Sequence, residues 1–367
     1  MKAPILRQLW PTTVLLSLGL WQPGVQAVEM PSPVSRTADI SEFDLEKLMQ
    51  IKVTSVSKRP ESWFGSAAAI DVIIAEDIHR SSANNLPDAL RGSPGLAVAR
   101  QDSHTWAISP RGFNSELASK TLVLIDGRSV YAPLNAGVYW DAQDVVLEDI
   151  NRIEVIRGPG GTLWGANAVN GVINITTKGA KDTQGLLVEG GGGSLERDFG
   201  TVRYGGQLGD HAWFRVYGKY FERENFLLPN GATAGDAWNK GQGGFRIDWE
   251  PSTANTFTLQ GDLYEGHEHQ TRTTAVPPPA FAQITNTLDR LAGGNVLGRW
   301  THSFSADSQL KVQLYFDRTE REFFIPQEER STVDLDVQHQ FRLCDRQEIV
   351  WGLGYRWTGD SMRTNFA

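Results

Sequence analysis

A glycine-rich run is the first place in this chain where residue types and spacing could do chemistry. The run extends from Gly158 to Gly165 and contains four glycines. Glycine-rich turns between a strand and a helix often hold phosphate groups on their backbone N–H donors. Here no Lys-Ser or Lys-Thr pair follows, and the glycine spacing does not fit the dinucleotide fingerprint. The run therefore predicts no nucleotide site.

A second group with chemical potential is His267-Glu268-His269, which lies in a predicted outer loop. Imidazole and carboxylate groups are ligands for zinc and other transition metals. No cysteine or aspartate cluster accompanies these residues in the sequence. The sequence alone assigns no metal here, and whether His267 and His269 bind one stays open.

Catalytic constellations were sought and none was found. The chain has no G-x-S-x-G nucleophile turn, no H-E-x-x-H helix, and no carboxylate pair with a reason to differ in pKa. We therefore predict that the protein is not an enzyme, and that it uses no cofactor.

The overall composition favours a membrane β-barrel over a helical membrane protein. The chain has 37 glycines and 12 tryptophans in 367 residues, with a mean hydropathy of -0.32. Beyond the N-terminus it has no apolar run of about 20 residues, the length that a spanning helix needs. A strand exposes only every second residue to lipid, so a polar average composition fits a barrel. The net charge of -8 argues against nucleic acid as a partner, and Cys344, the sole cysteine, is expected to be an inert thiol.

The first 27 residues are predicted to be a secretory signal peptide. Lys2 and Arg7 supply the positive charge, Val14 to Leu20 form the apolar core, and Ala27 ends a small-residue cleavage site. The apolar core is too short to span a membrane, so we expect export.

The glycine-rich run lies inside a region, residues 59–178, that reads as a compact α+β domain. Strands are expected over residues 69–74, 97–100, 105–111 and 122–125, with short helices that begin near residues 75 and 85. Asp126-Gly127 is a strong hairpin signal. Ile153 to Ile156 and Val172 to Thr177 are strands that flank the glycine-rich run and must position it.

Four segments of this domain resemble, in order, the plug domain of TonB-dependent outer-membrane receptors. They are Leu90–Leu96, Ser109–Phe113, Leu124–Tyr131 and Ile153–Lys178, and only Pro110 departs from the family pattern. The plug-motif positions that the resemblance implies are Arg111, Gly112, Phe113, Asp126, Gly127, Glu154, Arg157, Gly158, Pro159, Gly165, Asn167, Asn170 and Gly171. It also implies that Glu154 and Arg157 face a polar barrel lumen. With Arg111 they would either take part in plug movement or form static ion pairs, and both alternatives stay open.

The segment before this domain is where the family carries its TonB box. Apolar and polar residues alternate in Ile51, Lys52, Val53, Thr54, Ser55 and Val56. Such a segment can add as a strand to the sheet edge of a partner. The resemblance therefore implies that the energy-coupling protein TonB pairs with these residues, and a plain linker is the alternative.

Residues 179–367 read as about nine alternating strands of about ten residues each, the length that crosses a bilayer. Val202, Tyr204, Gly206 and Leu208 share one face, for example. Short connections alternate with long ones at residues 222–240, 266–290 and 319–330, as in outer-membrane barrels. A soluble β-sandwich is the alternative.

The family's barrels have about 22 strands, so the resemblance implies an incomplete barrel and we expect a truncated product. An open sheet in hydrocarbon would leave two unpaired edges.

The predicted fold class is an α+β plug domain followed by antiparallel transmembrane β-barrel strands. The predicted order is a signal peptide (1–27), a periplasmic segment with the TonB box (28–58), the plug (59–178) and a partial barrel (179–367). The resemblance implies a monomer in the outer membrane of a Gram-negative cell, in contact with lipid. It would import a scarce solute, such as a ferric siderophore, haem or cobalamin, with energy delivered by TonB. A passive porin-like channel or a non-functional receptor fragment is the alternative, and the ligand stays open.

Overall fold

The computed structural model describes residues 52–58, 61–66, 68–116, 120–134, 136–165, 167–275, 277–278, 280–322 and 327–363. The predicted signal peptide and Ile51 lie outside these residues. The chain divides into two units, Met1–Leu48 and Met49–Ala367, and the structure below is that of the second. No helix in the described ranges has the length and hydropathy to cross a membrane.

The first part of this unit is an α+β domain, residues 68–178, called the plug below. Its main sheet has five strands in the order β3-β8-β9-β6-β7. β6 and β9 run parallel, and the other neighbours are antiparallel. The bounds are β3 Ile70–Ile74, β4 Leu96–Arg100, β5 Trp106–Pro110, β6 Thr121–Ile125, β7 Arg128–Ser129, β8 Ile150–Arg157 and β9 Gly171–Thr177, with helices α2 Ala75–Arg80, α3 Leu86–Ala89 and α4 Gly161–Trp164 and 3-10 turns η3 Leu90–Gly92, η4 Leu147–Asp149 and η5 Ala180–Thr183.

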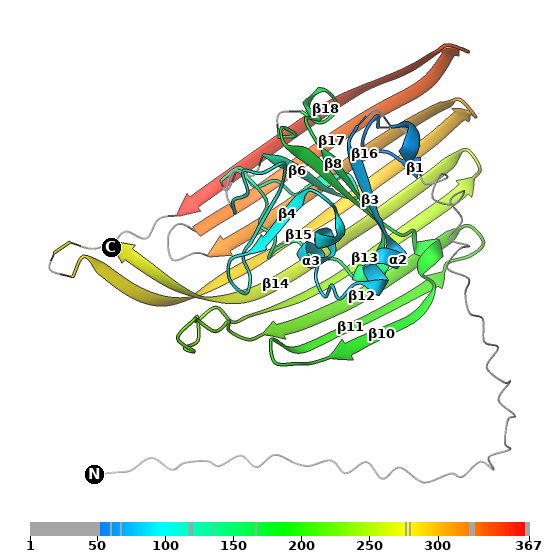
Figure 1. The fold of residues 1–367 in the computed structure, drawn as a ribbon. Helices are drawn as coiled ribbons and strands as arrows, with labels where there is room; N and C mark the ends of the chain where they lie inside the picture. The colour runs from blue at the N-terminus through cyan, green and yellow to red at the C-terminus, as the bar shows by residue number, and fades with distance from the viewer. Residues whose placement is uncertain are drawn as a thin grey trace, which may run out of the picture. The chain divides into compact units, whose positions relative to one another are not determined.

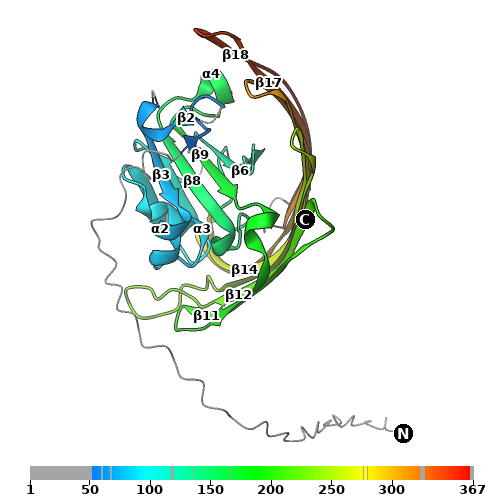
Figure 2. The ribbon, with the colours of Figure 1, turned by 90° about the vertical axis from the view of Figure 1, so that its right-hand side faces the viewer.

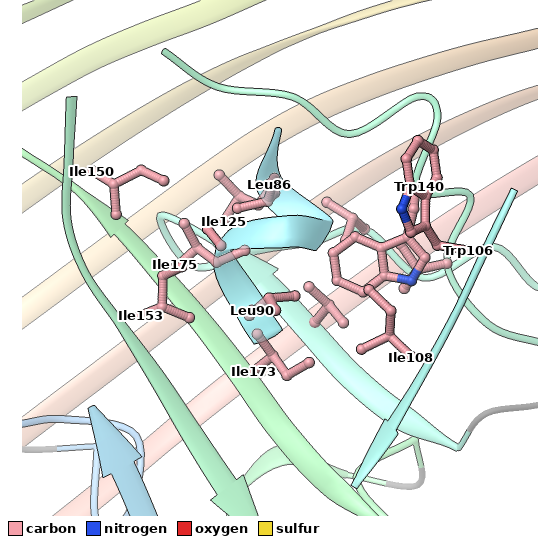
Figure 3. Close-up of a cluster of buried hydrophobic side chains, with 14 of the residues drawn as sticks. Leu86, Leu90, Trp106, Ile108, Ile125, Trp140, Ile150, Ile153, Ile173 and Ile175 are labelled. Carbon is pink, nitrogen blue, oxygen red and sulfur yellow. The ribbon is translucent and has the colours of Figure 1, made fainter. Parts of the chain in front are cut away.

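Apolar side chains cover both faces of the plug sheet. β6 and β9 are nearly continuous β-branched and leucine runs, which suits strands that are buried on both sides. Figure 3 shows one face, where Leu86 and Leu90 of the helical turns pack toward Ile173 and Ile175 of β9. A smaller cluster around Val72, Leu122 and Val172 covers the other face. The sheet is therefore a rigid support for the loops at its ends.

The remaining strands form one nine-stranded antiparallel sheet, called the wall below. Its order is β10 to β18 without a crossover, and Figure 1 shows the strands side by side in chain order. The bounds are β10 Gly185–Gly191, β11 Glu196–Gln207, β12 Ala212–Arg223, β13 Trp238–Ser252, β14 Asn255–Ala275, β15 Ala282–Ser305, β16 Ser308–Glu322, β17 Gln327–Cys344 and β18 Gln347–Arg363. β10 and β18 do not pair with each other, so the sheet is open across the described residues.

The wall is one curved layer, and the plug lies on its concave side (Figure 2). Side chains alternate along each strand between the two faces. Val202 and Tyr204 are half exposed on the convex face. Arg215 and Gln313 are buried on the concave face, toward the plug. The period-two pattern predicted from the sequence is thus the pattern of the wall.

Two predicted long loops are wrong. Residues 266–290 are mostly strand, because β14 and β15 continue to Ala275 and from Ala282. Residues 319–330 likewise belong mostly to β16 and β17. These strand ends are rich in Thr, Gln, Glu and Arg. A prediction that relies on alternating apolar residues assigns such segments to loops, although their backbones continue the hydrogen-bond ladder of the sheet. The predicted connection within residues 222–240 is confirmed, between β12 and β13.

Candidate functional site

The plug is attached to the wall by charged side chains, beginning with the β6–β7 hairpin. Arg128 of β7 donates to Asp317 of β16, with 2.6 Å between Nη1 and Oδ2. Both side chains are about nine-tenths buried. A buried ion pair is strongly destabilised when one partner is removed, because the other charge is left without compensation. This pair therefore fixes the position of the hairpin on the wall.

A second attachment runs along the segment that precedes β8. Asp144 accepts from Lys219 of β12, with 2.8 Å between Oδ1 and Nζ. Asp149 pairs with Arg203 and Arg215 of β11 and β12. All five side chains are largely buried. One extended segment of the plug is thus held by cations from two neighbouring wall strands.

The same segment begins with Asp141, which binds both terminal nitrogens of Arg321 of β16. Its backbone carbonyl also accepts from Lys240 of β13, at 2.8 Å from Nζ. Together with Asp144 and Asp149, this makes three aspartates of one loop that face wall cations. The interface between plug and wall is therefore polar and charged along this loop, whereas Phe221 and Trp238 of the wall join the apolar plug core beside Trp106.

The electrostatics of this interface favour the ionised form of Asp144 and of Asp126. Burial alone would raise the pKa of Asp144, but attraction by Lys219 and Lys240 outweighs it, and the pKa lies below its usual range. The pKa of Asp126 is also lowered. Burial would raise it, but attraction to Arg246, the backbone hydrogen bond from Thr177 and attraction to Arg299 outweigh burial.

Asp126 and Gly127 form the turn of the β6–β7 hairpin that the sequence predicts. Their φ angles are 51° and 84°, the positive values that a tight two-residue hairpin turn needs. The Asp126 carboxylate accepts from Thr177 N at 2.8 Å and from Gln260 of β14 at 2.9 Å. A Cβ on Gly127 would lie only 2.9 Å from the Gln313 side chain. The motif thus combines a tight turn with a close approach to the wall.

Glu154 of the signature strand β8 has another role. It is fully buried, and its carboxylate accepts from the backbone N–H groups of Thr54 and Ser55, at 3.1 and 2.8 Å. The Ser55 hydroxyl and Arg152 Nε donate as well. The expectation that Glu154 faces the barrel lumen is wrong. A buried carboxylate needs several donors, and the N-terminal segment supplies them.

The segment Lys52–Val56, the described part of the predicted TonB box, is docked on the plug. Lys52–Val53 is strand β1, which pairs with β2, Glu61–Ser62, just before the 3-10 turn η2, Trp63–Gly65. The Val53 side chain is fully buried, and Val56 packs on the smaller plug cluster beside Trp164. Trp164 Nε1 also donates to the Ser55 carbonyl at 2.7 Å. A partner strand could therefore pair with these residues only after they leave the plug.

The two predicted arginines also lie against other residues of the plug. Arg157 donates to the carbonyl of Pro94 at 2.8 Å, so it does not pair with Glu154 among the contacts described here. The Arg111 guanidinium lies over Gly158, 3.4 Å from where a Cβ would stand. Arg111, Gly112 and Phe113 all have positive φ angles, and Phe113 is 87 % exposed. Pro110 is accommodated because it ends β5, opposite Leu96.

The other motif positions surround the glycine-rich run. Gly171 begins β9, where a Cβ would lie 2.3 Å from the Ile156 carbonyl oxygen, so only glycine fits. Gly165 has a φ of 86° after α4. Pro159 is exposed, and Asn167 and Asn170 are half buried. The run shapes the backbone next to the docked box segment, since Trp164 of α4 holds Ser55.

A cavity of about 670 Å³ lies between the plug and strands β15 to β18. Its lining includes Thr54, Trp164 and Asn167 from the plug side and Arg299 and Lys311 from the wall. The cavity therefore adjoins both the docked box segment and the Asp126 turn.

The sequence reasoning missed three interface aspartates, Asp141, Asp144 and Asp149, and the wall cations that contact them. A signal was present, because Arg203, Arg215 and Lys219 occupy alternate positions between outward apolar residues. On a transmembrane strand such positions face the lumen. The sequence does not predict which plug carboxylate each cation contacts, because that depends on how the plug and the wall are placed.

Comparisons with known proteins agree with this architecture. The family model of the TonB-dependent receptor plug domain matches residues 64–172. The vitamin B12 transporter BtuB of Vibrio vulnificus is 34 % identical over 171 residues, which are 45 % of this chain and 27 % of that protein. The iron-regulated outer membrane virulence protein of Vibrio cholerae is 31 % identical over 222 residues, 55 % of this chain and 33 % of that protein. The chain thus spans a third or less of the length of these curated relatives.

Among solved structures, the ferripyoverdine receptor of the Pseudomonas aeruginosa outer membrane matches with a TM-score of 0.66 at 16 % identity. The match covers 86 % of this chain and 46 % of that receptor, and at this identity it shows the fold alone. Plug and wall are therefore arranged here as in a receptor of known structure. Residues 64–172 thus carry the plug domain of the TonB-dependent receptors, and the wall that follows has the fold of the barrel strands in a receptor of known structure.

Proposed function

We propose that the receptor to which this chain belongs imports a small solute across the outer membrane, with energy delivered by TonB. The observation that carries the proposal is the contact between the box segment and the plug. Glu154 binds the backbone of Thr54 and Ser55 directly, so a pull on this segment would act on β8, a central strand of the plug sheet.

The charged interface supports movement of the plug. Ion pairs and hydrogen bonds such as Asp144–Lys219 can be replaced by bonds to water when the plug moves. A dry apolar interface would instead lose about 25 cal/mol for every Å² exposed. A passive channel is the weaker alternative, because the plug occupies the concave side of the wall (Figure 2).

The relatives and the cavity together support a proposal for the solute class. One curated relative is named as a vitamin B12 transporter and another as iron-regulated. The cavity of about 670 Å³ between plug and wall has the volume of typical small-molecule sites. We propose a metal-containing small molecule, of the ferric siderophore, haem or cobalamin class.

Location in the outer membrane is supported by an aromatic belt on the wall. Trp249, Phe257 and Trp300 stack on three adjacent strands, with ring centroids 5.2 and 6.3 Å apart. The contacts continue through His302, Phe304, His339 and Trp351. These residues lie beside the short turns, where outer-membrane barrels carry an aromatic girdle at the interface. We propose that this end is periplasmic. We also propose that residues 1–27 are a signal peptide, 28–58 a periplasmic segment with the TonB box, 59–178 the plug and 179–367 part of the barrel.

The test uses Val53→Pro in the receptor expressed in cells. Proline removes the N–H of residue 53 and fixes φ, so a strand formed with TonB would be interrupted. We expect uptake of labelled cobalamin or ferric siderophore to fall to the level of cells without TonB. Lys52→Ala, a change of an exposed side chain that keeps the backbone intact, should leave uptake unchanged.

Val53→Ala separates the backbone effect from the loss of buried packing. It should retain most of the uptake if strand pairing with TonB is what matters. Energised uptake by the Val53→Pro receptor, or by the wild-type receptor in cells that lack TonB, would contradict the proposed function.

A further inference from the structure

The central residue of the His267-Glu268-His269 motif points toward the plug. The motif lies in strand β14, not in a loop as predicted. Glu268 is 3 % exposed, whereas His269 is exposed and His267 is half buried. Because neighbouring residues of a strand face opposite sides, the two histidines flank the carboxylate from the other face.

Two plug side chains meet Glu268 at this point. His104 comes from the loop between β4 and β5, and Asp141 from the loop before β8. Both are more than nine-tenths buried. One donor atom from each of the three residues lies within 4.8 Å of the other two. Three separate elements thus bring an imidazole and two carboxylates together.

The hydrogen bonds of His104 determine which ring nitrogen is available. Its Nε2 lies 3.3 Å from the His269 carbonyl oxygen, which can only accept, so Nε2 carries the hydrogen. The other nitrogen, Nδ1, lies 3.8 Å from Glu268 Oε2 and 3.5 Å from Asp102 Oδ1. In the neutral ring, Nδ1 has a lone pair. That lone pair faces two carboxylates and the rotatable Thr105 hydroxyl, whose Oγ1 lies 3.3 Å away. A cation would stabilise this arrangement.

The carboxylates have a shortage of positive partners. Arg321 binds Asp141 and lies 3.6 Å from Glu268 Oε2, but Glu268 Oε1 is buried with no hydrogen-bond partner among the described residues. Asp289 lies opposite Glu268 on β15. One of its oxygens binds Arg272, and the other is likewise buried and without a described partner. Among the contacts of the described residues, these three buried carboxylates share two guanidinium groups.

We propose that a divalent transition-metal cation binds here, held by His104 Nδ1, Glu268 and Asp141. A nitrogen and carboxylate donor set suits Zn²⁺ and its neighbours, whereas Ca²⁺ and Mg²⁺ prefer oxygen donors alone. The ion would link two plug loops to strand β14 of the wall. This site goes beyond the proposed function, because it needs neither TonB nor the imported solute.

The experiment is a Zn²⁺ titration of the purified, folded chain in detergent, after removal of metals with a chelator. Isothermal titration calorimetry should give one Zn²⁺ per chain. Glu268→Gln and His104→Ala should each weaken binding by at least about 10-fold, the smallest typical effect of altering a residue that only orients a metal ligand. The double variant His267→Ala/His269→Ala is the matched control and should bind as the wild type does.

A second measurement keeps the test independent of folding defects. Co²⁺ in place of Zn²⁺ should give a visible absorption spectrum that reports nitrogen coordination, and His104→Ala should change this spectrum. Glu268→Gln keeps the shape of the side chain that it replaces. Absent Zn²⁺ binding would overturn the proposal, and so would binding that is lost only in the His267/His269 double variant. A chain that gains stability on acidification but not on addition of Zn²⁺ would show that a proton on His104 fills this role, which also overturns it.

Discussion

Individual carboxylates determine where the plug is held, and each acts through a different kind of partner. Asp144 and Asp149 meet lysine and arginine side chains of the wall. Glu154, in contrast, binds backbone N–H groups of the box segment. Position in the fold, not residue type, decides whether a plug carboxylate connects to the wall or to the N-terminal segment.

Asp126→Asn tests the contribution of an ionised carboxylate to stability. The folded-state pKa of Asp126 is lowered, so its contribution is present above the unfolded pKa of about 3.9. It is lost as the pH falls through the folded pKa. We expect Asp126→Asn to lower the free energy of unfolding of the plug by about 1–3 kcal/mol at pH 7, measured from the urea midpoint. The difference from wild type should shrink as the pH falls below about 4, and a difference independent of pH would contradict this.

Glu154→Gln tests the link between box segment and plug. The amide keeps the size of the side chain, but its NH₂ group faces other hydrogen-bond donors, among them the N–H groups of Thr54 and Ser55. Hydrogen exchange at the amides of Thr54 and Ser55 should accelerate by about 10-fold, equivalent to about 1.4 kcal/mol for the loss of a charge-assisted bond. Glu76→Gln, on the exposed face of α2, is the control and should leave both amides unchanged. Equal exchange in all three proteins would show that Glu154 does not hold the segment.

The motif residues could be predicted from sequence, but their partners could not. The Asp126-Gly127 turn depends on local backbone geometry and was predicted correctly. The contact between Glu154 and Ser55 joins residues 99 positions apart, and nothing local encodes it. The sequence likewise indicated His267 and His269 as residues of a type that can bind metal. In the strand, however, it is Glu268, the residue between them, whose side chain faces the plug.

The strands of the wall were predictable where their outward residues are apolar. Alternation in β12 or β16 follows from one face in lipid and the other toward a polar lumen. The outer end of β14 is mainly polar, and the paired end of β15 has only Ile284 and Leu288 as large outward apolar residues, so the sequence carried a weak strand signal there. Their pairing continues to Ala275 and Ala282, which shows that backbone hydrogen bonds extend the ladder where the side chains do not reveal it.

The turns of the wall give a prediction about orientation. Cys344 ends β17 beside a short turn and is exposed. If short turns are periplasmic, a membrane-impermeant maleimide should label Cys344 only after the outer membrane is permeabilised. Asn230→Cys in a Cys344→Ser background places a thiol in the exposed connection between β12 and β13. It should label in intact cells, and the reverse pattern would invert the proposed orientation.

In the described part of the molecule, the plug has an apolar core, which Phe221 and Trp238 of the wall join, and is further held to the wall by charged side chains. A double-mutant cycle on Arg128 and Asp317 measures how strongly the plug and the wall are joined. Arg128→Ala and Asp317→Ala should each destabilise the plug–wall contact, and the pair should show a coupling free energy of about 1–3 kcal/mol. Urea unfolding gives the four values, and additive effects would mean that the ion pair does not hold the plug.

The most direct measurement is a photo-cross-link from the plug to the wall. A diazirine-bearing lysine analogue at Arg128 keeps the positive charge that pairs with Asp317. After irradiation of the folded chain, mass spectrometry should find residue 128 joined to a peptide from β16, Ser308–Glu322. Products only with lipid, or with peptides away from the concave face of β13 to β18, would contradict a plug held inside these strands.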